Sequence, residues 1–226
     1  MTRSPNHMAS TFYVQNFGCR ATQADGAAIE RALIQRGMEP GEECAAEVVV
    51  LNTCTVTAAA DADARAAIRR VRRENPGCKI LVTGCYAQRA PEELAAMEGV
   101  SWVVGNSHKH SIAEIIAPQS FVPVAQLSAP AACATGAPQF VGDIFAHTML
   151  MAAPVFDDAA SEKTRPNLKV QDGCDNRCSF CVIPSVRGQS RSLPLAEAVR
   201  EMRALVQLGY REVVLSGINL GRWGRD

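Results

Sequence analysis

The spacing of hydrophobic positions over the first 116 residues switches between two periods. Runs of consecutive apolar residues are typical of buried strands, and apolar residues repeating every three or four positions are typical of helices. The predicted strands cover residues 11–16, 47–51, 79–83 and 102–104, and the predicted helices cover 23–36, 57–74, 91–97 and 108–116. Strands that alternate with helices form βαβ crossovers, so we expect a parallel sheet with helices on both faces.

The pattern changes beyond this region. Residues 117–165 are rich in Ala and Pro and only weakly periodic, and we interpret 118–165 as a linker. The elements predicted after it are a strand at 167–171, an amphipathic helix at 195–208 and a strand at 211–216. The sequence therefore predicts an α/β protein with an amino-terminal parallel-sheet domain at 9–117, the linker, and the start of another α/β domain at 166–226.

Composition indicates where the protein is located more clearly than what it does. No run approaches the 18 or more apolar residues of a transmembrane helix, and the first ten residues lack the apolar core of a secretory signal. The 23 basic and 23 acidic residues cancel, so no general basic field points to nucleic acid. From Ser161 to Asp226 there are 11 Lys and Arg against 7 Asp and Glu, an excess of four that is compatible with a polyanionic partner. We expect a cytoplasmic protein with no membrane partner.

Nine cysteines are many for a chain without an export signal. In a reducing compartment they are more often metal ligands or catalytic groups than disulfides, and an odd number argues against a fully paired framework. The cysteines therefore hold most of the functional information in the sequence.

Three cysteines, Cys174, Cys178 and Cys181, have the spacing C-x3-C-x2-C. Three thiolates on one loop can bind three irons of a 4Fe–4S cluster, which leaves the fourth iron open to a cofactor. S-adenosylmethionine occupies that iron in radical-SAM enzymes. The loop follows a predicted strand and precedes a helix and a strand, as the active-site loops of βα barrels do. Residues 166–226 are thus expected to begin a radical-SAM partial TIM barrel.

The alternatives for this loop are a structural zinc site and a chance cluster. Zinc prefers paired C-x2-C units with a fourth ligand, and no suitable His follows. Phe180 before the last cysteine and the βαβ setting favour the radical-SAM interpretation.

Three further cysteines, Cys19, Cys54 and Cys85, each come within a few residues of the end of a predicted strand. Because such ends meet at one edge of a parallel sheet, the three thiols can converge on a second 4Fe–4S cluster. The alternative is that they are ordinary core cysteines, which are common, but the shared placement favours a cluster. The remaining cysteines lack this placement and are assigned to packing or solvent: Cys44, Cys78 and Cys133.

The segments around these six cysteines resemble the methylthiotransferase family. The matching stretches read NFGCR at 16–20, NTCTVT at 52–57, TGCYAQ at 83–88 and KVQDGCDNRCSFCVIPSVRG at 169–188. The resemblance covers nearly the whole chain outside 117–165. The residues beside the cysteines look like the branch that acts on N6-threonylcarbamoyladenosine at tRNA position 37. The alternative branches act on isopentenyladenosine in tRNA or on an aspartate of a ribosomal protein.

The resemblance implies a radical-SAM reaction with two 4Fe–4S clusters and S-adenosylmethionine. The cluster at Cys174, Cys178 and Cys181 would cleave this cofactor to a radical that takes hydrogen from C2 of the adenine. The other cluster would deliver a methylthio group to that carbon. The implied partners are the tRNA anticodon stem-loop, an external sulfur donor and an electron donor, and the target base must leave its stack.

We assign a catalytic role to no side chain. Three residues are instead candidates for cofactor binding. They are Phe180, Arg187, which lies in the matching PSVRG and could pair a planar anion, and Asn219 at a predicted strand end. The alternative for Arg187 is a solvated arginine, and the alternative for Asn219 is a residue of an ordinary turn. A basic helix end, formed by Arg65, Arg69, Arg70, Arg72 and Arg73, is either a solvated face or a tRNA backbone contact.

The family's barrel has more βα units than residues 166–226 supply, and members add an RNA-binding β-domain. We therefore expect the carboxyl-terminal half to be absent from this chain and the chain alone to be inactive. The alternative to an enzyme is a non-catalytic iron–sulfur-binding piece.

Overall fold

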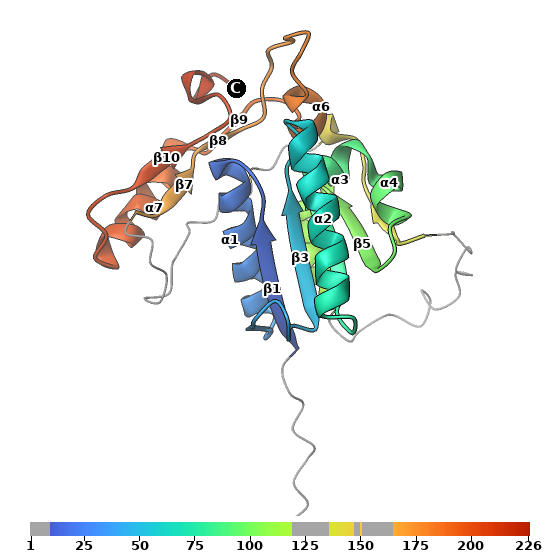
Figure 1. The fold of residues 1–226 in the computed structure, drawn as a ribbon. Coiled ribbons are helices and arrows are strands. Elements are labelled where there is room, and N and C mark those ends of the chain that lie inside the picture. The colour runs from blue at the N-terminus through green and yellow to red at the C-terminus, as the bar shows by residue number, and fades with distance from the viewer. Residues whose placement is uncertain (1–9, 119–135, 147–149, 151–164) are drawn as a thin grey trace, which may run out of the picture.

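The structure is a computed structural model that describes residues 10–118, 136–146, 150 and 165–226. The amino-terminal half forms a sheet flanked by helices, and residues 165–226 form a smaller unit that lies along the carboxyl ends of the strands (Figure 1). None of the helices in these residues has the length and apolar character needed to cross a membrane.

The large sheet has six strands in the order β2-β1-β3-β4-β5-β6. They are β1 (Thr11–Asn16), β2 (Glu39–Pro40), β3 (Val48–Thr53), β4 (Lys79–Gly84), β5 (Val100–Gly105) and β6 (Gln139–Phe140). All pairings in it are parallel, which confirms the predicted α/β fold with a parallel sheet. The central strand β3 is buried along its whole length, as expected for a strand covered on both faces.

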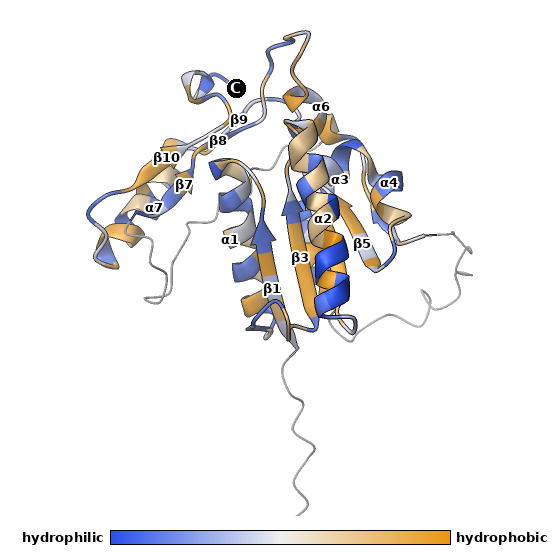
Figure 2. Ribbon diagram, viewed as in Figure 1, coloured by the Kyte–Doolittle hydropathy of each residue, from blue (hydrophilic) through white to orange (hydrophobic). Residues whose placement is uncertain are grey.

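Helices cover both faces of this sheet. They are α1 (Arg20–Gln35), α2 (Ala58–Glu74), α3 (Cys85–Arg89), α4 (Pro91–Ala95), the 3-10 helix η1 (Asn106–Ser111) and α5 (Ile112–Ile116). Because side chains alternate along a strand, Val49 of β3 packs with the apolar face of α2, whereas Val50 packs with that of α1. Figure 2 shows the hydrophobic strands between the helices and the polar outer face of α2. Thr57 caps α2, since its hydroxyl accepts a hydrogen bond from the Ala60 N–H over 3.2 Å.

Several short elements were not predicted. Strands β2 and β6 have two residues each, and α3 has five, too few to show a hydrophobic period. Strand β6 and the 3-10 helix η3 (Ile144–Ala146) lie inside 118–165, the region interpreted as a linker, and β6 pairs with β5. Most of 118–165, including Cys133, lies outside the described residues. The predicted helix 108–116 begins instead as η1 and continues as α5.

The smaller unit begins with the predicted strand 167–171, which divides into two. Strand β7 (Asn167–Lys169) pairs in parallel with β10 (Val214–Ser216), and β8 (Gln171–Asp172) pairs with β9 (Arg191–Ser192) in antiparallel. The division falls at Val170, whose N–H bonds Ser216 O and whose carbonyl accepts from Leu193 N. The chain therefore changes partners within one extended segment.

Three helical segments complete the smaller unit: α6 (Ile183–Arg187), α7 (Leu195–Gln207) and the 3-10 helix η4 (Leu220–Arg222). The predicted helix 195–208 is confirmed as α7, but its apolar face is only partly covered. Leu205 is buried, whereas Leu195 and Val206 are 64% and 63% exposed. In this unit the described residues offer α7 only short strands to pack against, which is too little surface to cover the whole face.

Candidate iron–sulfur centres

The cysteines at 19, 54 and 85 follow three strands that lie next to one another. Asn16 at the end of β1 pairs with Asn52 of β3, and Thr53 at the end of β3 pairs with Gly84 at the end of β4. The predicted placement at one edge of the sheet is therefore what the structure shows. The role of the three cysteines as iron ligands stays a prediction.

Glycines set the turns that bring two of these cysteines to the edge. Gly18, before Cys19, has a φ of +99°, and a Cβ on it would lie 2.7 Å from Cys54 Cβ. Gly84, before Cys85, has a φ of +100°, and a Cβ there would lie 2.2 Å from the Thr53 carbonyl oxygen. Only glycine adopts this conformation without strain while leaving room for the neighbouring chain.

The three sulfurs have different surroundings. Cys19 is exposed and lies 3.5 Å from Thr22 Oγ1, whereas Cys54 and Cys85 are buried. Although desolvation acts to raise the pKa of the Cys19 thiol, the Arg187 guanidinium and hydrogen bonds at Thr22 lower it below its ordinary value. Burial raises the pKa of Cys54, and the nearby Cys85 and Cys19 sulfurs raise it further. The three groups are thus close enough to interact, with Arg187 on the Cys19 side.

The second cysteine set lies on the loop between β8 and α6, which projects from the molecule (Figure 1). The loop is fixed at its base, because Cys174 N donates to Gly188 O over 3.0 Å and Gly173 N donates to Asp172 Oδ1 over 2.8 Å. Cys178 is exposed, and Cys174 and Cys181 are partly buried. A loop with a fixed base and a projecting tip leaves its thiols accessible to a large ligand.

Among the residues that the structure describes, no three His, Cys, Asp or Glu side chains converge as the ligands of a single metal ion would. A four-iron cluster is bound with one thiolate per iron, so its cysteines need not meet at one point. The thiolate-only donor sets suit iron–sulfur chemistry, and the glycine turns place them on a common side of the chain. The residues present therefore fit the predicted clusters in chemistry and in placement.

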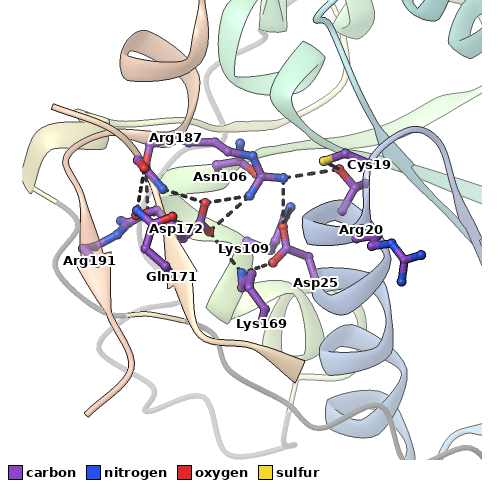
Figure 3. A network of polar contacts seen from close by, with 12 residues as sticks. Cys19, Arg20, Asp25, Asn106, Lys109, Lys169, Gln171, Asp172, Arg187 and Arg191 are labelled. Atoms are coloured by element: carbon purple, nitrogen blue, oxygen red, sulfur yellow. Dashed lines mark hydrogen bonds and ion pairs between the residues drawn. The ribbon is translucent and has the colours of Figure 1, made fainter. Parts of the chain in front are cut away.

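A network of buried charged side chains joins the two units (Figure 3). The buried charge network, as we call it, consists of Asp25, Lys109, Lys169, Asp172 and Arg187. Asp25 of α1 pairs with Lys169 of β7, and its Oδ2 lies 3.0 Å from Lys109 Nζ. Arg187 NH1 donates to both oxygens of Asp172 over 2.9 and 3.1 Å, and its NH2 lies 3.3 Å from Asp25 Oδ2.

These pairings determine the protonation of the network. Burial alone would raise the pKa of both carboxyls, but the cations around them prevail. Lys109, Lys169 and Arg187 lower the pKa of Asp25 to about 2, and Arg187 and Lys169 hold that of Asp172 well below its usual range. Burial lowers the pKa of Arg187, yet Asp172, Cys85, Asp25 and Cys19 together keep it well above its ordinary value. Both carboxylates are therefore charged at neutral pH.

The candidate cofactor-binding residues lie in three different settings. Phe180 is 90% exposed at the tip of the cysteine loop. Asn219 lies against the loop base, with its Nδ2 3.7 Å from Cys174 Sγ and its backbone N–H donating to Gln171 Oε1 over 2.6 Å. Arg187 is 2% exposed within the network, and its Nε–H has no partner among the described residues. Their contacts with a cofactor stay predictions.

The remaining cysteines and the basic face of α2 give no further indication of a functional site. Cys44 is exposed and Cys78 is partly buried, as assigned. On the basic face of α2, Arg65, Arg70 and Arg72 form ion pairs with acidic side chains, which agrees with a solvated face.

Sequence reasoning did not find the buried charge network or Asn106. Asn106 Nδ2 donates to Val186 O over 2.7 Å and lies 3.5 Å from Cys85 Sγ. One signal was available: Lys169 stands inside the predicted strand 167–171, and a charge that is buried in a strand without a partner is costly. Its partner Asp25 is 144 residues away, so the pairing could not be identified from spacing.

The fold and the two cysteine sets have the arrangement predicted for a radical-SAM protein with a second, cysteine-bearing α/β domain. Residues 168–219 match the family described as the Radical SAM superfamily, and residues 11–105 match the one described as uncharacterized protein family UPF0004. The chain thus carries, in this order, a segment that matches family UPF0004 and a segment that matches the Radical SAM superfamily.

Several curated relatives are similar to nearly the whole chain. The threonylcarbamoyladenosine tRNA methylthiotransferase of Aquifex aeolicus is 38% identical over 94% of this chain and 48% of its own length. The protein of the same name from Bacillus subtilis is 35% identical over 96% of this chain and 45% of its own length. The tRNA-2-methylthio-N(6)-dimethylallyladenosine synthase of Zymomonas mobilis is 33% identical over 95% of this chain and 45% of its own length. The chain thus spans about half the length of the curated relatives that it matches.

Proposed function

We propose that this chain is the amino-terminal part of a cytoplasmic enzyme that transfers a methylthio group to C2 of N6-threonylcarbamoyladenosine at tRNA position 37. The observation that carries the proposal is the presence of two three-cysteine sets, one at the carboxyl edge of the large sheet and one on the loop between β8 and α6. The buried charge network joins the two units that bear them (Figure 3). Cys174, Cys178 and Cys181 would hold one 4Fe–4S cluster, and Cys19, Cys54 and Cys85 the other.

When bound at the exposed loop, a 4Fe–4S cluster with S-adenosylmethionine supplies radical chemistry that no side chain can. The chain's own part is to bind and to orient. The fixed base of the loop keeps Cys174 against Asn219, while the projecting tip leaves Cys178 and Phe180 open to a large substrate. A tRNA base that is splayed from its stack would enter from this open side.

The second candidate is the same transfer to an isopentenyladenosine-type base. It is favoured by the 33% identity to the Zymomonas mobilis synthase, which is only slightly lower than the values for the threonylcarbamoyladenosine enzymes. The residues beside the cysteines, FGCR and NTCTVT, favour the first candidate through the family resemblance. The ribosomal-protein branch has only that general resemblance in its support.

Iron content tests the two-cluster basis of the proposal. After anaerobic reconstitution the chain should bind about eight irons, and a triple Ala variant of either cysteine set should bind about four. Cys44→Ala, an exposed cysteine outside both sets, serves as the control and should bind about eight. Four irons in the original chain and none in the Cys174/Cys178/Cys181 variant would show that the amino-terminal cysteines are not ligands.

The substrate is tested by nucleoside analysis of tRNA. A host that lacks the full-length gene should accumulate unmodified threonylcarbamoyladenosine, and the gene should restore its 2-methylthio form. A Cys54→Ala version should not restore it, whereas Cys44→Ala should. Restoration of methylthio-isopentenyladenosine instead would establish the second candidate. Expressed alone, this chain is expected to leave tRNA unmodified.

A further inference from the structure

The buried charge network is not balanced. It contains two carboxylates, Asp25 and Asp172, against three cations, and the five side chains are between 1% and 9% exposed. Arg191, which is 11% exposed, adds another positive charge 3.9 Å from Asp172. A buried charge without a counter-charge is costly, and a purely structural joint would be more stable if the charges matched. A further negative group nearby would therefore stabilise the extra positive charge.

Arg187 of the network and its neighbour Val186 are each linked to the amino-terminal cysteine set. Arg187 NH2 lies 3.3 Å from Thr22 Oγ1, and the same hydroxyl lies 3.5 Å from Cys19 Sγ. One residue earlier, Val186 O accepts from Asn106 Nδ2, which lies 3.5 Å from Cys85 Sγ. A single segment of α6 is thus linked through one side chain each to Cys19 and to Cys85. The negative groups nearest to the extra charge would be the thiolates of this cysteine set.

We propose that Arg187 is a positioning residue for the set Cys19, Cys54 and Cys85. Anchored by Asp172 and Asp25, it fixes a positive charge beside these thiolates and ties the smaller unit to that edge of the sheet. The inference rests on the proposed function, because it assumes that the set binds an iron–sulfur cluster. A buried charge acts strongly on a cluster, since net charge and surrounding hydrogen bonds set its reduction potential.

The test isolates this cluster by using the Cys174→Ala/Cys178→Ala/Cys181→Ala background. The midpoint potential of the remaining cluster is measured by redox titration with electron paramagnetic resonance. Arg187→Gln removes a positive charge and should shift the potential to a more negative value. Asp25→Asn removes a negative charge from the same network and should shift it to a more positive value. Arg165→Gln, in an ion pair that is 60% exposed on both sides, is the matched control and should leave it unchanged.

Opposite shifts in the two network variants would support the inference, because general destabilisation cannot produce both signs. Unchanged potentials, or shifts in the same direction, would overturn it. Arg187→Lys keeps the charge and should return the potential toward the original value. If Arg187→Gln does not fold, Asp25→Asn decides alone: a positive shift supports the inference and no shift overturns it. Absence of iron from the background variant would instead contradict the proposed function itself.

Discussion

Asn106 donates a hydrogen bond from its side-chain amide to the backbone oxygen of Val186 over 2.7 Å, which joins the start of η1, directly after β5, to α6 across 80 residues of sequence. Both residues are buried, so water cannot replace the bond. The contact belongs to the joint between the two units, together with the bond from Asn167 Nδ2 to Arg20 O of 2.8 Å. The stability of the whole chain should therefore depend on it.

Asn106→Ala should lower the free energy of unfolding by about 1–3 kcal/mol, because it leaves the Val186 carbonyl buried without its donor. Urea unfolding of the metal-free chain measures the change. Asn176→Ala, in the exposed cysteine loop, is the matched control and should stay within about 0.5 kcal/mol. Equal effects of the two substitutions would contradict a role for Asn106 in the joint.

Gly18→Ala should disrupt the amino-terminal cysteine edge. The new Cβ meets Cys54 Cβ at 2.7 Å and also has to accept a φ of +99°. Gly37→Ala is the control, since Gly37 has a φ of +81° with nothing within 4 Å of the added Cβ. Both variants should lose about 1–2 kcal/mol from the backbone conformation. Only Gly18→Ala should fall from about eight to about four bound irons on reconstitution. An unchanged iron content in Gly18→Ala would mean that this turn does not set the position of Cys54.

The acid stability of the chain should depend on Asp25. Its pKa in the folded chain is lowered from 3.8 to about 2, so its stabilising effect is complete above the unfolded value and is lost as the pH falls from about 4 to 2. The shift corresponds to about 2 kcal/mol. The free energy of unfolding should therefore fall less steeply over this range in Asp25→Asn than in the original chain. Glu212→Gln, in an exposed ion pair, should follow the original profile, and a parallel profile for Asp25→Asn would refute the prediction.

The charge imbalance of the network predicts an order of stabilities. Asp25→Ala leaves three buried cations with one carboxylate and should cost about 3–5 kcal/mol. Lys109→Met leaves two cations and two carboxylates, so its cost should be smaller, about 1–3 kcal/mol. Burial lowers the pKa of Lys109, which agrees with a cation that the network can lose more easily. Denaturant unfolding of the two metal-free variants gives the comparison, and a larger loss for Lys109→Met would reverse the order.

Much of the fold follows from local sequence. The Val-rich segment at β3 and the apolar stripes of α1 and α2 have periods that a short window reveals, and each was predicted within a few residues. The placement of Cys19, Cys54 and Cys85 at one edge also follows, because parallel strands bring their carboxyl ends together once the alternation is recognised.

Other features required the tertiary structure. Strand β6 has only two residues and exists because β5 offers it an edge. Asp25 and Lys169 would be taken for surface residues from their charge, yet both are buried because each supplies the other's counter-charge. The sequence by itself determined the alternation of strands and helices and the position of the cysteines after the strands, since both depend on neighbours along the chain. Only the tertiary structure decided how the two cysteine sets are joined, because charges and hydrogen bonds act through space between residues that are 80 to 165 positions apart.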